Sequence, residues 1–153
     1  MLALMVVSVI VAEVPNAART QQICEVGRAA LRDLPPADLG GSSDIYYEGP
    51  NTNHHDLLGM CPELKDILPT GYLLADSDAR RRAAVHVPLV GTNTRPASIY
   101  TIQIPEISAD RQSAIVHFAY RCTGLCGGEF DARYVRTSRG WQRDGSVRTL
   151  SVS

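Results

Sequence analysis

Four cysteines carry the most distinctive chemistry of this 153-residue chain. Cys122 and Cys126 flank Thr-Gly-Leu, and the two glycines that follow suit a sharp turn. A disulfide between them closes a short loop and stabilises the fold by about 2 kcal/mol, because it restricts the unfolded chain. If Cys24 and Cys61 form the other disulfide, they close a longer loop, and this bridge stabilises the fold by about 1.5–2 kcal/mol more than the first. Two disulfides are the simplest use of four cysteines in an exported protein, although the sequence leaves their connectivity open.

Redox catalysis and zinc binding are the alternative uses of Cys122 and Cys126. Thiol oxidoreductases place a C-x-x-C pair at a helix N-terminus, whereas this pair has three intervening residues and lies in a predicted β-turn. The histidines available as further zinc ligands are His54, His55, His86 and His117. On a regular strand, His117 and Cys122 point to opposite faces because they are five positions apart. We therefore favour a structural disulfide and assign no metal site.

The predicted strand over residues 114–122 carries the best candidates for a ligand pocket. His117 shares one face of it with Ile115, Ala119 and Arg121, and either lines a pocket or is a half-exposed strand residue. The other face and the next two strands carry aromatic side chains, namely Phe118, Tyr120, Phe130, Tyr134 and Trp141. They form either ordinary core or a concave aromatic face that lines an apolar pocket. The predicted pocket residues are His117, Phe118, Tyr120, Tyr134 and Trp141.

Catalytic signatures are absent from the sequence. No G-x-S-x-G, H-E-x-x-H, P-loop or dinucleotide-binding glycine pattern occurs, and no nucleophile can be matched with a base. We therefore assign no catalytic residue and expect no cofactor. The formal net charge of −1 gives no support to nucleic-acid binding.

The charge is unevenly distributed along the chain. Residues 13–78 contain eleven acidic and four basic side chains, and residues 79–153 contain five acidic and eleven basic ones. We expect the two halves of one domain to attract each other, with the remaining charges solvated. The alternative is a basic sheet face that binds an anionic surface, with Arg80-Arg81-Arg82 as its strongest local element.

Residues 1–18 are predicted to be a signal peptide, and residues 19–153 a single domain. Residues 2–12 are apolar, which is too short for a bilayer span but fits the hydrophobic part of a leader. The positive residues that usually precede this part are missing, so a buried N-terminal helix or strand of a cytoplasmic protein is the alternative. We expect a periplasmic or secreted location and no stable membrane span in the mature chain.

The apolar spacing predicts an α+β fold. Residues 20–34 form an amphipathic helix with Thr20 as its N-cap, and residues 56–68 are helical and divided by Pro62. A long loop over 33–53 contains a short extended piece at 45–47. Alternating patterns predict strands over 83–90, 98–104, 114–122, 129–136 and 141–152. These strands are expected to form a curved antiparallel meander with the first helix packed on its concave face.

The motif from Tyr120 to Gly127, Y-x-C-x-x-L-C-G, is followed by a strand and then by Gly140-Trp141. This pattern resembles small exported bacterial proteins of unknown function, over about the last forty residues. The resemblance implies a hairpin and export, and it carries over no catalytic residue. The chain departs from the pattern at Leu150-Ser151-Val152, where those proteins often have Trp-Ile-Ser. The helix-and-sheet outline also resembles cystatin-like and NTF2-like folds.

The sequence thus favours an exported or periplasmic, non-enzymatic protein that binds a small molecule or a protein partner. One alternative is an enzyme, either a thiol-redox protein using Cys122 and Cys126 or a hydrolase with a His117 pocket. The other is a cytoplasmic interaction module whose apolar N-terminal segment belongs to the core.

Overall fold

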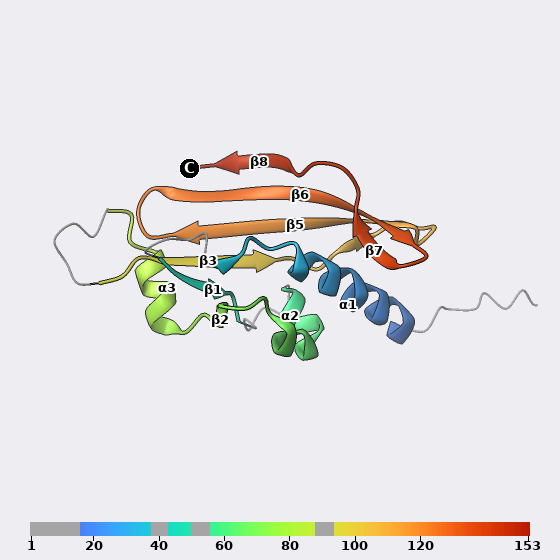
Figure 1. Ribbon diagram of the computed structural model, residues 1–153, viewed down its shortest axis with the longest axis horizontal. Coiled ribbons are helices and arrows are strands. Elements are labelled where there is room, and N and C mark those ends of the chain that lie inside the picture. Colours follow the sequence, from blue (N-terminus) through green and yellow to red (C-terminus); the bar gives the residue numbers. More distant parts are fainter. Residues whose placement is uncertain (1–15, 38–42, 50–55, 88–93) are drawn as a thin grey trace, which may run out of the picture.

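The computed structural model describes residues 16–37, 43–49, 56–87 and 94–153, and it shows an α+β fold (Figure 1). A curled, mixed β-sheet carries helices on one face and a further short helix at one end of the other face. The predicted leader over residues 1–18 lies outside the described residues except for its last three, which belong to the first helix.

The first helix, α1 (Asn16–Arg32), lies against the core through a buried stripe. The buried members of this stripe and of the turn that follows are Ile23, Val26, Ala29, Ala30, Leu31 and Leu34. The stripe matches the predicted apolar spacing. The predicted N-cap at Thr20 is wrong, because the helix begins a full turn earlier at Asn16. Pro35 and Pro36 follow the helix and supply no backbone N–H to continue it.

Two short helical segments follow where residues 56–68 were predicted to be helical. Asp56 caps α2 (Leu57–Met60), since its Oδ1 accepts a hydrogen bond from the Gly59 N–H at 2.6 Å. Pro62 opens the 3₁₀-helix η2 (Pro62–Ile67), as predicted, and Cys61 lies at the joint. A disulfide between Cys24 and Cys61 ties α1 to this joint.

The sheet contains eight strands in the described part of the chain. They are β1 (Asp44–Tyr47), β2 (Leu73–Leu74), β3 (Ala97–Ile102), β4 (Glu106–Ile107), β5 (Ser113–Cys122), β6 (Cys126–Thr137), β7 (Gly140–Arg143) and β8 (Arg148–Val152). The main order is β2-β1-β3-β5-β6-β7, with β4 paired to β5 and β8 paired to β6. The long β5–β6 hairpin forms the centre of this sheet (Figure 1).

The sheet is not the simple antiparallel meander that the alternation predicts. Strand β1, which comes from the early loop, lies parallel to both β2 and β3, so the sheet is mixed. The strands from β3 onward pair antiparallel, as expected. The predicted last strand is two strands, β7 and β8, separated by a turn in which Gly145 has a φ of 78°.

The predicted strand over residues 83–90 is wrong where the structure describes it. Residues 77–83 form helix α3 (Ser77–Ala83), residues 84–87 form no strand, and residues 88–90 lie outside the described residues. Asp76 caps α3 by accepting a hydrogen bond from the Ala79 N–H at 2.7 Å. The small side chains of Ala79 and Ala83 are buried against the sheet beside Ile99. Capping and alanine packing therefore prevail over a short alternating pattern.

Gly27 allows α1 and α2 to pack closely. A Cβ atom at this position would overlap the side chain of Leu57, which has no exposed surface. We expect Gly27→Ala to lower the free energy of unfolding by about 1–3 kcal/mol through overpacking. On an open helix face, the same glycine-to-alanine change would raise the free energy of unfolding by about 1 kcal/mol.

Urea unfolding of Gly27→Ala and of Gly27→Ala/Leu57→Val checks this expectation. The double variant should show a smaller loss than the sum of its single changes, because the smaller valine makes room for the added methyl group. Unchanged or increased stability in Gly27→Ala would show that this helix contact is not tight.

Candidate functional site

The β5–β6 hairpin is closed by the predicted disulfide between Cys122 and Cys126. The two cysteines face each other in the strand register, and Thr123, Gly124 and Leu125 form the turn. Gly124 supplies the left-handed conformation of this turn, with a φ of 98°. Gly127 and Gly128 do not turn the chain, contrary to prediction, because both are paired residues of β6.

An aromatic row crosses three neighbouring strands beside this hairpin. The ring of Tyr120 on β5 stacks with Tyr100 on β3 at a centroid distance of 5.5 Å. It also stacks with Phe130 on β6 at 6.0 Å. Tyr72 meets Tyr100 edge to face at 5.8 Å. The result is a continuous aromatic surface on the face of the sheet that also carries α1.

Gly128 makes room for this row. It lies opposite Tyr120 in the β5–β6 register. A Cβ atom there would lie 2.9 Å from ring atoms of both Tyr120 and Phe130. The missing side chain therefore lets the two rings lean over the strand and stack on each other.

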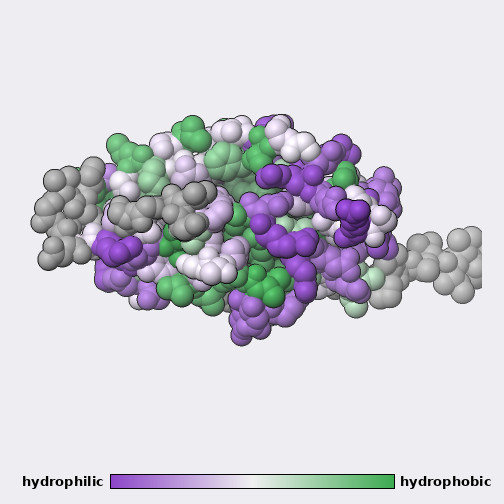
Figure 2. Space-filling model, in the orientation of Figure 1, coloured by the Kyte–Doolittle hydropathy of each residue, from purple (hydrophilic) through white to green (hydrophobic). Residues whose placement is uncertain are grey.

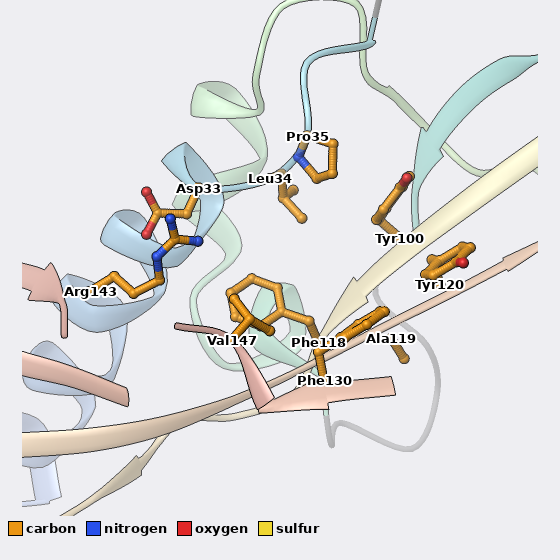
Figure 3. A pocket seen from close by; sticks show the side chains of 10 residues that line it. All are labelled: Asp33, Leu34, Pro35, Tyr100, Phe118, Ala119, Tyr120, Phe130, Arg143 and Val147. Carbon is orange, nitrogen blue, oxygen red and sulfur yellow. The ribbon is translucent and has the colours of Figure 1, made fainter. Parts of the chain in front are cut away.

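A cleft of about 370 Å³ opens above the aromatic row. Its lining residues are Asp33, Leu34, Pro35, Tyr100, Phe118, Ala119, Tyr120, Phe130, Arg143 and Val147 (Figure 3). The volume is within the range of small-molecule sites. Figure 2 shows hydrophobic surface at the centre of this side of the molecule, beside the hydrophilic surface of α1.

The wall opposite the row comes from the segment that follows α1. Leu34 and Pro35 lie across the cleft from Phe118 (Figure 3). The hydroxyl of Tyr72 donates a hydrogen bond to the Pro35 carbonyl oxygen at 2.7 Å, which attaches this wall to the sheet side of the molecule. Burial raises the pKa of Tyr72, so the hydroxyl keeps the proton that it donates.

The two ends of the cleft differ in chemistry. At one end, the Asp33 carboxylate and the Arg143 guanidinium lie beside each other (Figure 3). Asp33 Oδ2 accepts a hydrogen bond from the Tyr134 hydroxyl at 2.7 Å. At the other end are the hydroxyls of Tyr100 and Tyr120, neither of which has a hydrogen-bond partner among the described residues. Burial, and to a lesser extent the neighbouring Tyr120, raises the pKa of Tyr100.

The predicted pocket residues do not all meet in this cleft. Phe118 and Tyr120 line it. Tyr134 and Trp141 are buried in the core, and Tyr134 reaches the site only through its hydrogen bond to Asp33. His117 lies on the opposite face of β5, where its Nδ1 is 2.9 Å from Oδ1 of Asp131.

Sequence reasoning missed several residues of the cleft. Tyr100 alternates with Ile99 in a predicted strand, so the pattern already indicated that the two side chains lie on opposite faces of the sheet. Phe130 was placed on the correct face but was not assigned to the pocket. Asp33 and Arg143 are separated by more than a hundred positions in the sequence, and no local pattern connects them.

The opposite face of the sheet carries a wider, shallower groove of about 730 Å³ beside the disulfide hairpin. His86 and Arg121 are among its lining residues, whereas His117 lies outside it. The arginines on this side are paired with acids from the first half of the chain: Glu48 pairs with Arg80 and Arg121, and Asp44 pairs with Arg82 and Arg95. The expected attraction between the two halves is thus confirmed, and these ion pairs neutralise much of the alternative basic face.

The structure offers one cluster of potential metal ligands within its described residues, formed by Cys24, Cys61 and Glu63. Both sulfur atoms of this cluster are in a disulfide and are not thiolates, so it does not provide a zinc site. The candidate ligands His54 and His55 lie outside the described residues.

None of the helices in the described ranges has the length and apolar character needed to cross a membrane. No protein-family model, curated protein or solved structure matches this chain.

Proposed function

We propose that the protein is a non-enzymatic binding protein of the periplasm or the extracellular space, and that its aromatic cleft holds a small, flat, largely apolar molecule. The observation that carries this proposal is the stacked row of Tyr100, Tyr120 and Phe130, which lines a cleft of about 370 Å³. Aromatic side chains offer large contact areas and lose little conformational freedom on binding. The free hydroxyls of the described residues Tyr100 and Tyr120 can orient a polar group of the ligand.

The compartment is supported by the two disulfides, Cys24–Cys61 and Cys122–Cys126. Disulfides persist in oxidising locations and are rare in the reducing cytosol. Export to the periplasm or secretion is the simplest route to such a location for a chain with an apolar segment over residues 2–12.

The neutral fluorophore N-phenyl-1-naphthylamine provides the direct test. We expect one molecule to bind per chain with increased fluorescence, and Tyr120→Ala to weaken binding about tenfold through lost aromatic contact. Phe130→Leu should also weaken binding of the fluorophore. Ile115→Ala is the matched control, because Ile115 lies on the opposite face of the same strand and is 41% exposed.

Circular dichroism should show that each variant keeps its fold. The proposal fails if the fluorophore does not bind stoichiometrically, or if Tyr120→Ala and Ile115→Ala have the same affinity as the wild type.

Acid–base catalysis by His117 is the second candidate function. Asp131 holds His117 Nδ1 at 2.9 Å, which leaves Nε2 available as a base. The pair lies across the sheet from the aromatic cleft, so a His117 enzyme would work on the other face. Turnover of a chromogenic ester that disappears in His117→Gln would favour this function over binding. Cys122 and Cys126 both belong to strands, so neither lies at a helix N-terminus, where thiol oxidoreductases place their cysteines.

A further inference from the structure

The charged end of the aromatic cleft distinguishes between classes of flat ligand. We propose that the cleft selects an anionic aromatic molecule, a carboxylate or sulfonate on a planar ring system, whose anionic group binds Arg143. This inference rests on the proposed binding function and specifies the ligand class of the same site.

Arg143 is available to a ligand. It extends from β7 into one end of the cleft, where it lies beside Asp33 (Figure 3). In the described part of the chain it forms no ion pair, unlike the arginines of α3. The planar guanidinium can donate two parallel hydrogen bonds to a carboxylate or sulfonate, which fixes the orientation of the bound group.

Asp33 does not turn this end of the cleft into a cation site. One of its oxygens, Oδ2, already accepts a hydrogen bond from the buried Tyr134 hydroxyl. Arg32, in the last turn of α1, lies close enough to act electrostatically on Tyr134, and so does Arg143. Asp33 and Arg143 are the charged side chains that line the cleft, and of these two only Arg143 makes no hydrogen bond or ion pair among the described residues. An anionic group that reaches this end can therefore bind Arg143, whereas a cationic group would have to share a carboxylate that Tyr134 already engages.

The geometry of the cleft connects the two kinds of contact. The aromatic rings of Phe118 and Phe130 lie between the Arg143 end and the Tyr100–Tyr120 end (Figure 3). A planar ligand that covers these rings can thus place one substituent at Arg143 and another at the tyrosine hydroxyls. Both contacts are available to one molecule because a single cleft contains all of these residues.

Two fluorophores with the same ring system separate charge recognition from apolar binding. 8-Anilino-1-naphthalenesulfonate carries a sulfonate, and N-phenyl-1-naphthylamine does not. We expect Arg143→Gln to weaken binding of the sulfonate about fivefold to tenfold, and to leave the affinity for the neutral compound within about twofold. Arg143→Lys should retain part of the preference, and added salt should weaken only the sulfonate.

Arg139→Gln is the matched control, because it removes the same charge from the exposed β6–β7 turn. Equal effects of Arg143→Gln on both fluorophores, or equal effects of Arg143→Gln and Arg139→Gln on the sulfonate, would overturn the anionic ligand class. If the neutral fluorophore still binds in that case, and its binding depends on Tyr120, the proposed function stands. If neither fluorophore shows binding that depends on Tyr120, both the proposed function and the ligand class are wrong.

Discussion

Replacing Cys24 and Cys61 together by alanine should lower the free energy of unfolding by about 4 kcal/mol, a large part of the stability of a domain of this size. The disulfide joins positions 37 residues apart, so its loss releases much conformational entropy in the unfolded chain. Cys61 is fully buried at the joint between α2 and η2, and its removal also weakens the attachment of α1.

The Cys122→Ala/Cys126→Ala double variant is the matched control. This bridge spans a separation of only four, and its removal should cost about 2 kcal/mol. Urea unfolding of both double variants measures the difference. The entropic account is wrong if the hairpin variant loses as much stability as the Cys24/Cys61 variant. Intact mass after alkylation without reduction should show no label on the wild type, because both pairs are bridged.

The second large effect is a steep loss of stability above pH 10. Burial is the main cause that raises the pKa of Tyr47, Tyr72 and Tyr134 well above the ordinary tyrosine value. The unfolded chain releases these protons near pH 10, whereas the folded protein retains them, so alkali favours unfolding. The stabilising contribution is complete below pH 10 and is lost as the pH rises toward the folded pKa values.

The size of this effect follows from proton linkage. Each of the three tyrosines contributes up to about 1.4 kcal/mol per pH unit, so the free energy of unfolding should fall by about 4 kcal/mol per unit above pH 11. Urea unfolding between pH 8 and pH 12 measures the slope, and absorbance at 295 nm follows tyrosinate formation. Constant stability up to pH 11.5, or gradual titration of all tyrosines near pH 10 without unfolding, would contradict it.

Tyr72→Phe is the control for the alkaline effect. It removes one titrating group and should reduce the slope by about a third. At neutral pH it should cost only about 1 kcal/mol, because it removes the hydrogen bond to the Pro35 carbonyl. This variant also detaches one wall of the cleft, so it connects the stability of the fold with the shape of the site.

The proposed site depends on contacts from all parts of the chain. Asp33 and Pro35 come from the segment after α1, the aromatic row comes from β3, β5 and β6, and Arg143 comes from β7. The disulfide that anchors α1 and the hydrogen bond from Tyr72 to Pro35 position one wall. The β5–β6 hairpin, closed by its own disulfide, positions the other.

The sequence alone determined those features that arise from local periodicity. The apolar stripe of α1, the break at Pro62 and the alternation along β5 each depend on neighbouring residues, and each is present in the structure. The sequence favoured the pairs Cys24–Cys61 and Cys122–Cys126 but left their connectivity open, and the structure contains both bridges.

Tertiary structure decided what depends on residues far apart in the chain. The parallel placement of β1, the close approach of Leu57 to Gly27 and the pairing of Arg121 with Glu48 have no local signal. Helix α3 is a further example, because the packing of its alanines against the sheet is a contact between distant parts of the chain. The cleft itself belongs to this class. Asp33 and Arg143 become neighbours only when α1 and β7 pack together. Sequence spacing indicates contacts within a helix or strand, whereas contacts between distant segments form only through packing.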